Sequence, residues 1–111
     1  MKAKILSLVV LFLMGMMSVL AQSKTEKFKV YGNCGKCEQR IEKAALSVEG
    51  VDAVDWNKKT KMIEVSFDQK KTDINKIHVA ITKAGYDTDK KKAPTTDYKG
   101  LPGCCKYDRP K

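Results

Sequence analysis

Cys34 and Cys37 form a CxxC motif between a strand-like run and a helix-like run of the chain. The start of a helix presents free backbone N–H groups and the positive end of the helix dipole, which together favour thiolate over thiol. Two thiolates one helical turn apart can bind a soft metal ion or exchange with a disulfide, and Gly35 between them allows a tight backbone turn. The motif therefore predicts either metal binding or thiol redox chemistry.

Cys104 and Cys105 form a second pair near the end of the chain. Adjacent cysteines can bridge each other only in a strained ring, and a CxxC bridge closes a very small loop. Two tight pairs are therefore not typical of a disulfide framework. Two interpretations of the second pair stay open: additional metal ligands that fold back onto the CxxC motif, or a stabilising link or incidental tail.

The ligand types narrow the choice of metal. Soft thiolates select Cu(I) or Hg(II), and they also bind Zn(II) when further ligands join. His78 is the only histidine, and its position in the middle of a helix-like run predicts a surface or boundary residue rather than a ligand. Two thiolates without a histidine favour a linear soft ion, so we expect Cu(I) first, with Hg(II) and Zn(II) as alternatives.

The first residues are typical of an export signal. Lys2 and Lys4 precede an apolar run over Ile5–Leu20, and cleavage is expected between Ala21 and Gln22. The run is 16 residues long, whereas a membrane-spanning helix needs about 20, so we prefer a cleaved signal to an uncleaved anchor. The sequence thus predicts a periplasmic or secreted protein.

The balance of charge is basic, with 22 Lys and Arg against 13 Asp and Glu among 111 residues. The lysines are scattered and aromatic residues are few, so the charge indicates a solvated surface rather than nucleic-acid binding. The sequence shows no arrangement of acid and base residues suited to catalysis. We therefore do not expect an enzyme.

Apolar periodicity predicts strands over 25–31, 51–56, 61–67 and 86–88, and helices over 36–49 and 74–84. This order predicts an α+β ferredoxin-like βαββαβ sandwich, with a four-stranded antiparallel sheet and two helices on one face. Residues 90–111 lack periodicity and are expected to form an irregular tail. We divide the chain into a signal peptide (1–21), a domain (22–89) and a Cys-containing C-terminal tail (90–111).

Three segments resemble the heavy-metal-associated domain family: Cys34-Gly35-Lys36-Cys37 followed by Ile41-Glu42-Lys43-Ala44, then Val48-Glu49-Gly50-Val51, then Ala84-Gly85-Tyr86-Asp87. That family includes copper chaperones, modules of copper-transporting ATPases and periplasmic mercury-binding proteins. The resemblance, over residues 26–88, implies near-linear Cu(I) binding by Cys34 and Cys37. It also implies ligand exchange with a metal-transporting membrane protein or another thiol-rich carrier.

Two neighbours of the motif could act on the bound ion. The resemblance implies that Tyr86 packs close to the site, and Lys36 could offset the negative charge of two thiolates. A core aromatic and a solvated lysine are the alternatives. The family commonly has Gly-Met-Thr or Gly-Met-His before its first cysteine, where this chain has Tyr31-Gly32-Asn33. Because Gly32 cannot fill the space of that buried Met, either the loop is looser or another side chain packs there.

A different class, thiol–disulfide oxidoreductases, also places a CxxC at a helix start. Such enzymes need a longer domain and a cis-proline opposite the motif, whereas Pro94, Pro102 and Pro110 all follow the expected sheet. We therefore keep this function as an alternative. We expect a monomer, with a metal-bridged dimer as the other possibility.

Overall fold

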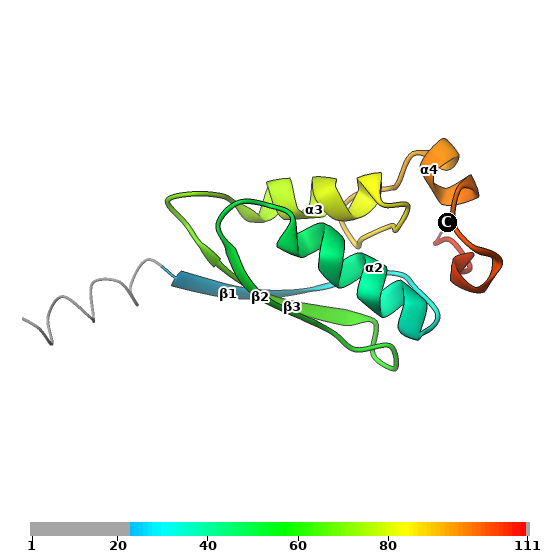
Figure 1. The fold of residues 1–111 in the computed structure, drawn as a ribbon, viewed down its shortest axis with the longest axis horizontal. Helices are drawn as coiled ribbons and strands as arrows, with labels where there is room; N and C mark the ends of the chain where they lie inside the picture. Colours follow the sequence, from blue (N-terminus) through cyan, green and yellow to red (C-terminus); the bar gives the residue numbers. More distant parts are fainter. Residues whose placement is uncertain (1–22, 111) are drawn as a thin grey trace, which may run out of the picture.

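The computed structural model describes residues 23–110, so the expected signal peptide lies outside the described residues. The elements in chain order are β1 (Ser23–Lys29), α2 (Gly35–Leu46), β2 (Val51–Trp56), β3 (Met62–Asp68), α3 (Ile74–Lys83), α4 (Thr95–Lys99) and the 3-10 helix η1 (Gly103–Cys105). Figure 1 shows α2 and α3 side by side on one face of the sheet. The two-layer α+β arrangement agrees with the prediction.

Within residues 23–110 the sheet has three antiparallel strands in the order β1-β3-β2. The central strand β3 pairs with β1 from Ser23↔Asp68 to Lys29↔Met62, and with β2 through a register shift near Ala53. Alternate residues of β3 face the helices, as the period-2 pattern predicts. The buried ones are Ile63, Val65 and Phe67.

The predicted fourth strand over residues 86–88 does not form in the described part of the chain. A single antiparallel bridge, Val30↔Thr88, is what remains of it. The segment around Asp87 does not extend its pairing with the chain after β1. The Asp87 N–H donates to the Tyr107 hydroxyl, 2.7 Å away, instead of to a strand. The tail thus takes a hydrogen-bonding position that a longer strand could have used.

Helix α2 carries the predicted apolar stripe, with Cys37, Ile41 and Ala45 buried. It ends three residues earlier than predicted because Ser47 closes the last turn, with its hydroxyl donating to the Ala44 carbonyl. Helix α3 begins at Ile74, as predicted, and the Asp73 carboxylate caps it by accepting from the Lys76 N–H at 2.9 Å. No helix of the described residues is long and apolar enough to span a membrane.

His78 on α3 is buried, so the expectation of a surface or boundary position is wrong. Only 2% of its surface is exposed, and its ring centre lies 3.9 Å from that of Phe28. The helix lies flat on the sheet, which turns this side chain inward. The imidazole Nδ1 lies 2.7 Å from the Thr88 hydroxyl, so His78 belongs to the packing of α3, and it is not among the residues grouped with the cysteines.

The C-terminal tail is ordered rather than irregular, because it contains α4 and η1 and contributes to the core. Leu101, Cys105 and Tyr107 are all buried in the same apolar cluster as the helices and the sheet. Figure 1 shows the orange and red tail at the end of the molecule where α2 begins, and η1 contacts α2. The tail therefore reaches the CxxC motif.

Candidate metal centre

The CxxC motif lies at the N-terminus of α2, as predicted. Cys34 is the extended residue that precedes the helix, and Cys37 lies in its first turn. The two sulfur atoms are 3.6 Å apart, with Cys37 fully buried and Cys34 partly exposed. Both are free thiols that point to a common place at the surface end of the helix. One of them is open to an incoming reactant.

The environment of Cys34 favours its thiolate. The backbone N–H of Cys37 lies near the Cys34 sulfur and makes the largest contribution to lowering its pKa to about 7. Burial works in the opposite direction but is outweighed by this N–H, by the Cys37 thiol and by the Lys36 N–H. Cys34 is therefore ionised near neutral pH to a much larger extent than an ordinary thiol, and thiolate is the form that binds metal.

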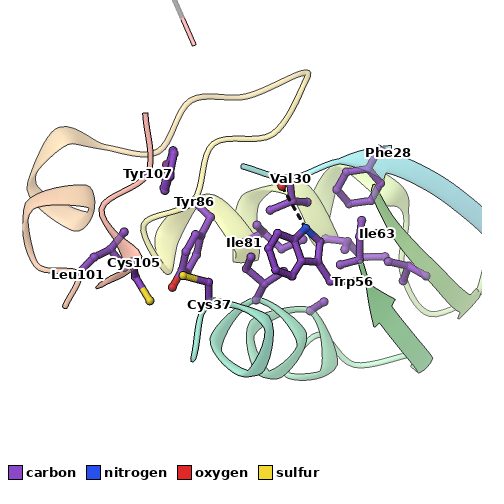
Figure 2. Packing of buried hydrophobic residues seen from close by; sticks show 14 of the residues in the cluster. Phe28, Val30, Cys37, Trp56, Ile63, Ile81, Tyr86, Leu101, Cys105 and Tyr107 are labelled. Atoms are coloured by element: carbon purple, nitrogen blue, oxygen red, sulfur yellow. Dashed lines mark hydrogen bonds between the residues drawn. The ribbon is translucent and has the colours of Figure 1, made fainter. Parts of the chain in front are cut away.

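The space that the family's buried Met would fill is occupied by other side chains. A Cβ added at Gly32 would lie 3.0 Å from both the Ile41 Cδ1 and the Trp56 ring. The indole N–H of Trp56 donates to the Val30 carbonyl at 3.1 Å, which fixes the ring beneath the loop (Figure 2). Of the two expectations for this position, the structure shows a neighbouring side chain packed there. Trp56 lies in the strand predicted over 51–56, but its support of this loop was not predicted.

Gly35, in contrast, is not required by its conformation. Among the described glycines only Gly50 and Gly85 have φ in the left-handed region, and a Cβ added at Gly35 would meet no atom within 4 Å in the described chain. The tight turn expected from Gly35 is made by ordinary helical backbone. Gly85 does adopt φ +107° after α3, a conformation that glycine favours at the end of a helix.

The second cysteine pair lies against the first. The sulfur atoms of Cys34, Cys104 and Cys105 are all within 4.8 Å of one another, and Cys104 and Cys105 are 3.9 Å apart. Cys104 is exposed, whereas Cys105 is buried and points toward Cys37 (Figure 2). Burial, together with the Cys37 thiol, raises the pKa of Cys105 to about 12. Of the two interpretations left open by the sequence, this proximity favours the one in which the tail folds back.

Tyr86 is completely buried beside these sulfurs, and Lys36 is exposed. The Tyr86 hydroxyl lies beside Cys37 and Cys105 (Figure 2). Within residues 23–110 this hydroxyl has no hydrogen-bond partner. Burial raises the pKa of Tyr86, so the group is a neutral O–H donor at any physiological pH. Lys36 contributes its backbone N–H to the Cys34 environment, and its side chain is solvated.

A hydrogen-bonded latch, formed by Tyr107 and Arg109 on the segment around Asp87, holds the tail in place. The Tyr107 hydroxyl donates to the Gly85 carbonyl at 2.9 Å and accepts from the Asp87 N–H. Arg109 binds the buried Asp87 carboxylate through two hydrogen bonds of 2.9 and 2.8 Å. Sequence reasoning missed both latch residues, because nothing in the spacing of the aperiodic tail marks them as buried or paired.

The fold and the site together define a class: a small α+β domain whose thiols converge at the start of a helix, as in metal-binding domains. The family model described as "Heavy-metal-associated domain" matches residues 28–87. The chain belongs to this family. Cys104 and Cys105 lie beyond the matched residues, so the second thiol pair is a feature of this chain outside the family's common region.

Two similar proteins carry a mercury-transport name. A "Mercuric transport protein periplasmic component" of Shewanella putrefaciens is 37% identical over 84 residues, which cover 75% of this chain and 92% of that protein. A protein of the same name from Pseudomonas aeruginosa is 36% identical over 74 residues, covering 66% and 81% respectively. These relatives are metal-transport proteins by name.

Solved structures of both mercury and copper proteins have the same fold. Oxidized MerP from Ralstonia metallidurans CH34 is 35% identical with a TM-score of 0.58, covering 60% of this chain and 94% of that one. A structure named CopZ metallochaperone is 30% identical with a TM-score of 0.57, covering 59% and 98%. The same fold therefore serves proteins named for copper and for mercury.

Proposed function

We propose that this protein is an exported carrier that binds one soft metal ion through Cys34 and Cys37 and passes it on by thiolate exchange. The main support for this proposal is that two free thiols, 3.6 Å apart, converge at the start of α2. The lowered pKa of Cys34 supports it, since part of the ligand set is already ionised near neutral pH.

Hg(II) is the cargo that we propose first. Five relatives at 35–37% identity carry a mercuric transport name, and an oxidized MerP structure is 35% identical. Cu(I), which the sequence analysis placed first, becomes the second candidate and is supported by the likeness to CopZ. Both ions are soft and favour thiolates, whereas Zn(II) needs a more complete ligand set.

The unequal exposure of the two cysteines suggests the order of exchange. An acceptor thiolate can reach the metal from the side of Cys34, because Cys37 is fully buried. The acceptor sulfur bonds to the metal, the Cys34–metal bond then breaks, and the released thiolate of Cys34 is free to take a proton. A second acceptor thiolate then replaces Cys37 in the same way.

The names of the relatives also support an exported location and a membrane partner. The mercuric relatives are named as periplasmic transport components, and the N-terminal pattern of this chain is typical of a cleaved signal. We propose that a thiol-bearing metal-transporting membrane protein receives the ion. We also propose that the protein acts as a monomer and is not an enzyme.

Metal titration of the reduced protein tests this function. We expect one Hg(II) per chain, retained against a monothiol competitor and measured by native mass spectrometry under anaerobic conditions. The variant Cys34→Ser/Cys37→Ser should lose at least tenfold in affinity. Ser47→Ala, a small change at the opposite end of the same helix, should keep the affinity and is the control. Equal retention by the cysteine variant would contradict the proposal, as would metal-free turnover in an insulin-reduction assay.

A further inference from the structure

The Cys34 sulfur belongs to two groups of thiols at once. It lies 3.6 Å from Cys37, and it also lies within 4.8 Å of both Cys104 and Cys105. The Cys34 thiol additionally contacts the Cys104 carbonyl at 3.6 Å. The tail pair is therefore placed at the motif itself and not merely on the same side of the molecule.

The distances between sulfurs fit a site with more than two ligands. With metal–thiolate bonds of about 2.3 Å, as for zinc, the sulfurs are about 4.6 Å apart in a linear site, about 4.0 Å in a trigonal one and about 3.8 Å in a tetrahedral one. The measured separations of 3.6 Å within the CxxC pair and 3.9 Å within the tail pair are close to the last two values. Linear binding would require the CxxC pair to spread.

The Tyr86 hydroxyl is a second, independent sign of a bound ion. The residue is completely buried, and within the described chain its hydroxyl has only the thiols of Cys37 and Cys105 beside it, which are weak acceptors. A buried O–H whose only neighbouring acceptors are weak is unfavourable. Once the neighbouring thiols lose their protons to bind metal, each thiolate becomes an acceptor that this O–H can use.

The latch explains how the tail thiols can be held ready. Leu101 packs against Gly85, where an added Cβ would lie only 2.9 Å from the Leu101 Cδ2. Tyr107 bonds to Gly85 and Asp87, and Arg109 pairs with the buried Asp87 carboxylate. These contacts lie on both sides of η1, so its two cysteines cannot drift freely from the site. Preorganised ligands lose less conformational entropy when they bind.

We infer that Cys104 and Cys105 complete the metal site, so that the protein encloses its ion in three or four thiolates shared between the CxxC motif and the latched tail. The inference rests on the proposed function and deepens it. Each tail thiol that binds releases its proton to solvent, and an acceptor must then displace the tail as well as Cys34. The tail thus controls how readily the ion leaves.

The test counts sulfur ligands by X-ray absorption on reduced, Hg(II)-loaded protein at one ion per chain. We expect three or four sulfurs in the natural protein and two in Cys104→Ser/Cys105→Ser, with one ion per chain in both. The double variant should also lose its ion to a dithiol competitor at least tenfold faster. Lys106→Ser, an exposed change in the same segment, should behave as the natural protein.

Three further measurements check the fold of each variant, the effect of Cys104 alone and the oligomeric state. Because Cys105 is buried, circular dichroism checks the fold of each variant. The exposed single change Cys104→Ser should leave no more than three sulfurs and should speed release. A count of two sulfurs in the natural protein would overturn the inference and leave the proposed function intact. A count of four would overturn it as well if light scattering showed that two chains share one ion. Failure of the proposed function is detected separately, by unchanged binding in Cys34→Ser/Cys37→Ser.

Discussion

At the scale of residues, the four cysteines are chemically unequal although they lie together. Cys34 is partly exposed and has a pKa lowered to about 7 by the Cys37 N–H, whereas Cys105 is buried with a pKa raised to about 12. One thiol is therefore prepared for exchange, while another gives up its proton only when a metal replaces it. This difference gives the site a defined point of entry.

Alkylation measures the difference directly. In the reduced, metal-free protein, iodoacetamide should modify Cys34 with a midpoint near pH 7 and Cys105 negligibly below pH 9, as followed by peptide mass spectrometry. At pH 7 the thiolate fraction of Cys34 is about fiftyfold larger than that of a thiol with a pKa near 9. The urea-unfolded protein is the control, in which all four cysteines should react alike. A Cys34 midpoint near 9 would refute the assignment.

At the scale of elements, the loop before α2 depends on what lies beneath it. Gly32 lies on Ile41 and on the Trp56 ring, and the Trp56 indole is fixed by the Val30 carbonyl. The ring has little room to yield, because it is buried in the apolar core. Trp56, a strand residue, thus fills the space beneath the loop where the family commonly has a Met.

Two glycine substitutions separate packing from backbone conformation. Gly32→Ala should destabilise the protein by about 1–3 kcal/mol, since the new methyl group overpacks a filled site. Gly35→Ala is the matched control and should be neutral or slightly stabilising, because it adds a methyl group in open space at the helix start. Urea unfolding in reductant measures both. Equal effects of the two changes would show that the contact at Gly32 is unimportant.

Sequence periodicity was sufficient for the elements that follow a regular pattern. The stripe through Cys37 and Ile41 and the alternation through Ile63 and Val65 predicted α2 and β3 to within a few residues, and the CxxC spacing predicted the converging thiols. The prediction of a fourth strand was wrong because the backbone N–H of Asp87 donates to the hydroxyl of Tyr107 in the tail. Such long-range bonds leave no periodic trace, which is also why the latch could not be predicted.

At the scale of the whole molecule, the tail is part of the folded unit. The Asp87 carboxylate is fully buried, which opposes its ionisation, yet the hydrogen bonds from Arg109 and the Ala93 N–H outweigh burial and lower its pKa. An ion pair of this kind holds its two segments together only while both partners are present. Its loss should affect stability and metal release together.

The variant Arg109→Ala should lower the free energy of unfolding by about 3 kcal/mol at pH 7, since it leaves a buried carboxylate unpaired. Arg40→Ala, an exposed arginine of α2, is the control and should change little. Because the folded pKa of Asp87 is depressed, its contribution is complete above the ordinary value of 3.8 and is lost as pH falls through the folded value. The difference between natural protein and variant should therefore shrink in acid, and a constant difference would argue against this pair.

The position of this ion pair bears on where the domain can be cut. The family match ends at residue 87, yet Asp87 has its partner at Arg109, and Gly85 is covered by Leu101. A fragment trimmed to the matched residues would expose the surface that the tail covers. It would also leave the Asp87 carboxylate without its Arg109 partner. For transplanting the thiol motif into another scaffold, or for fusing a reporter to it, the indivisible module runs to at least Arg109.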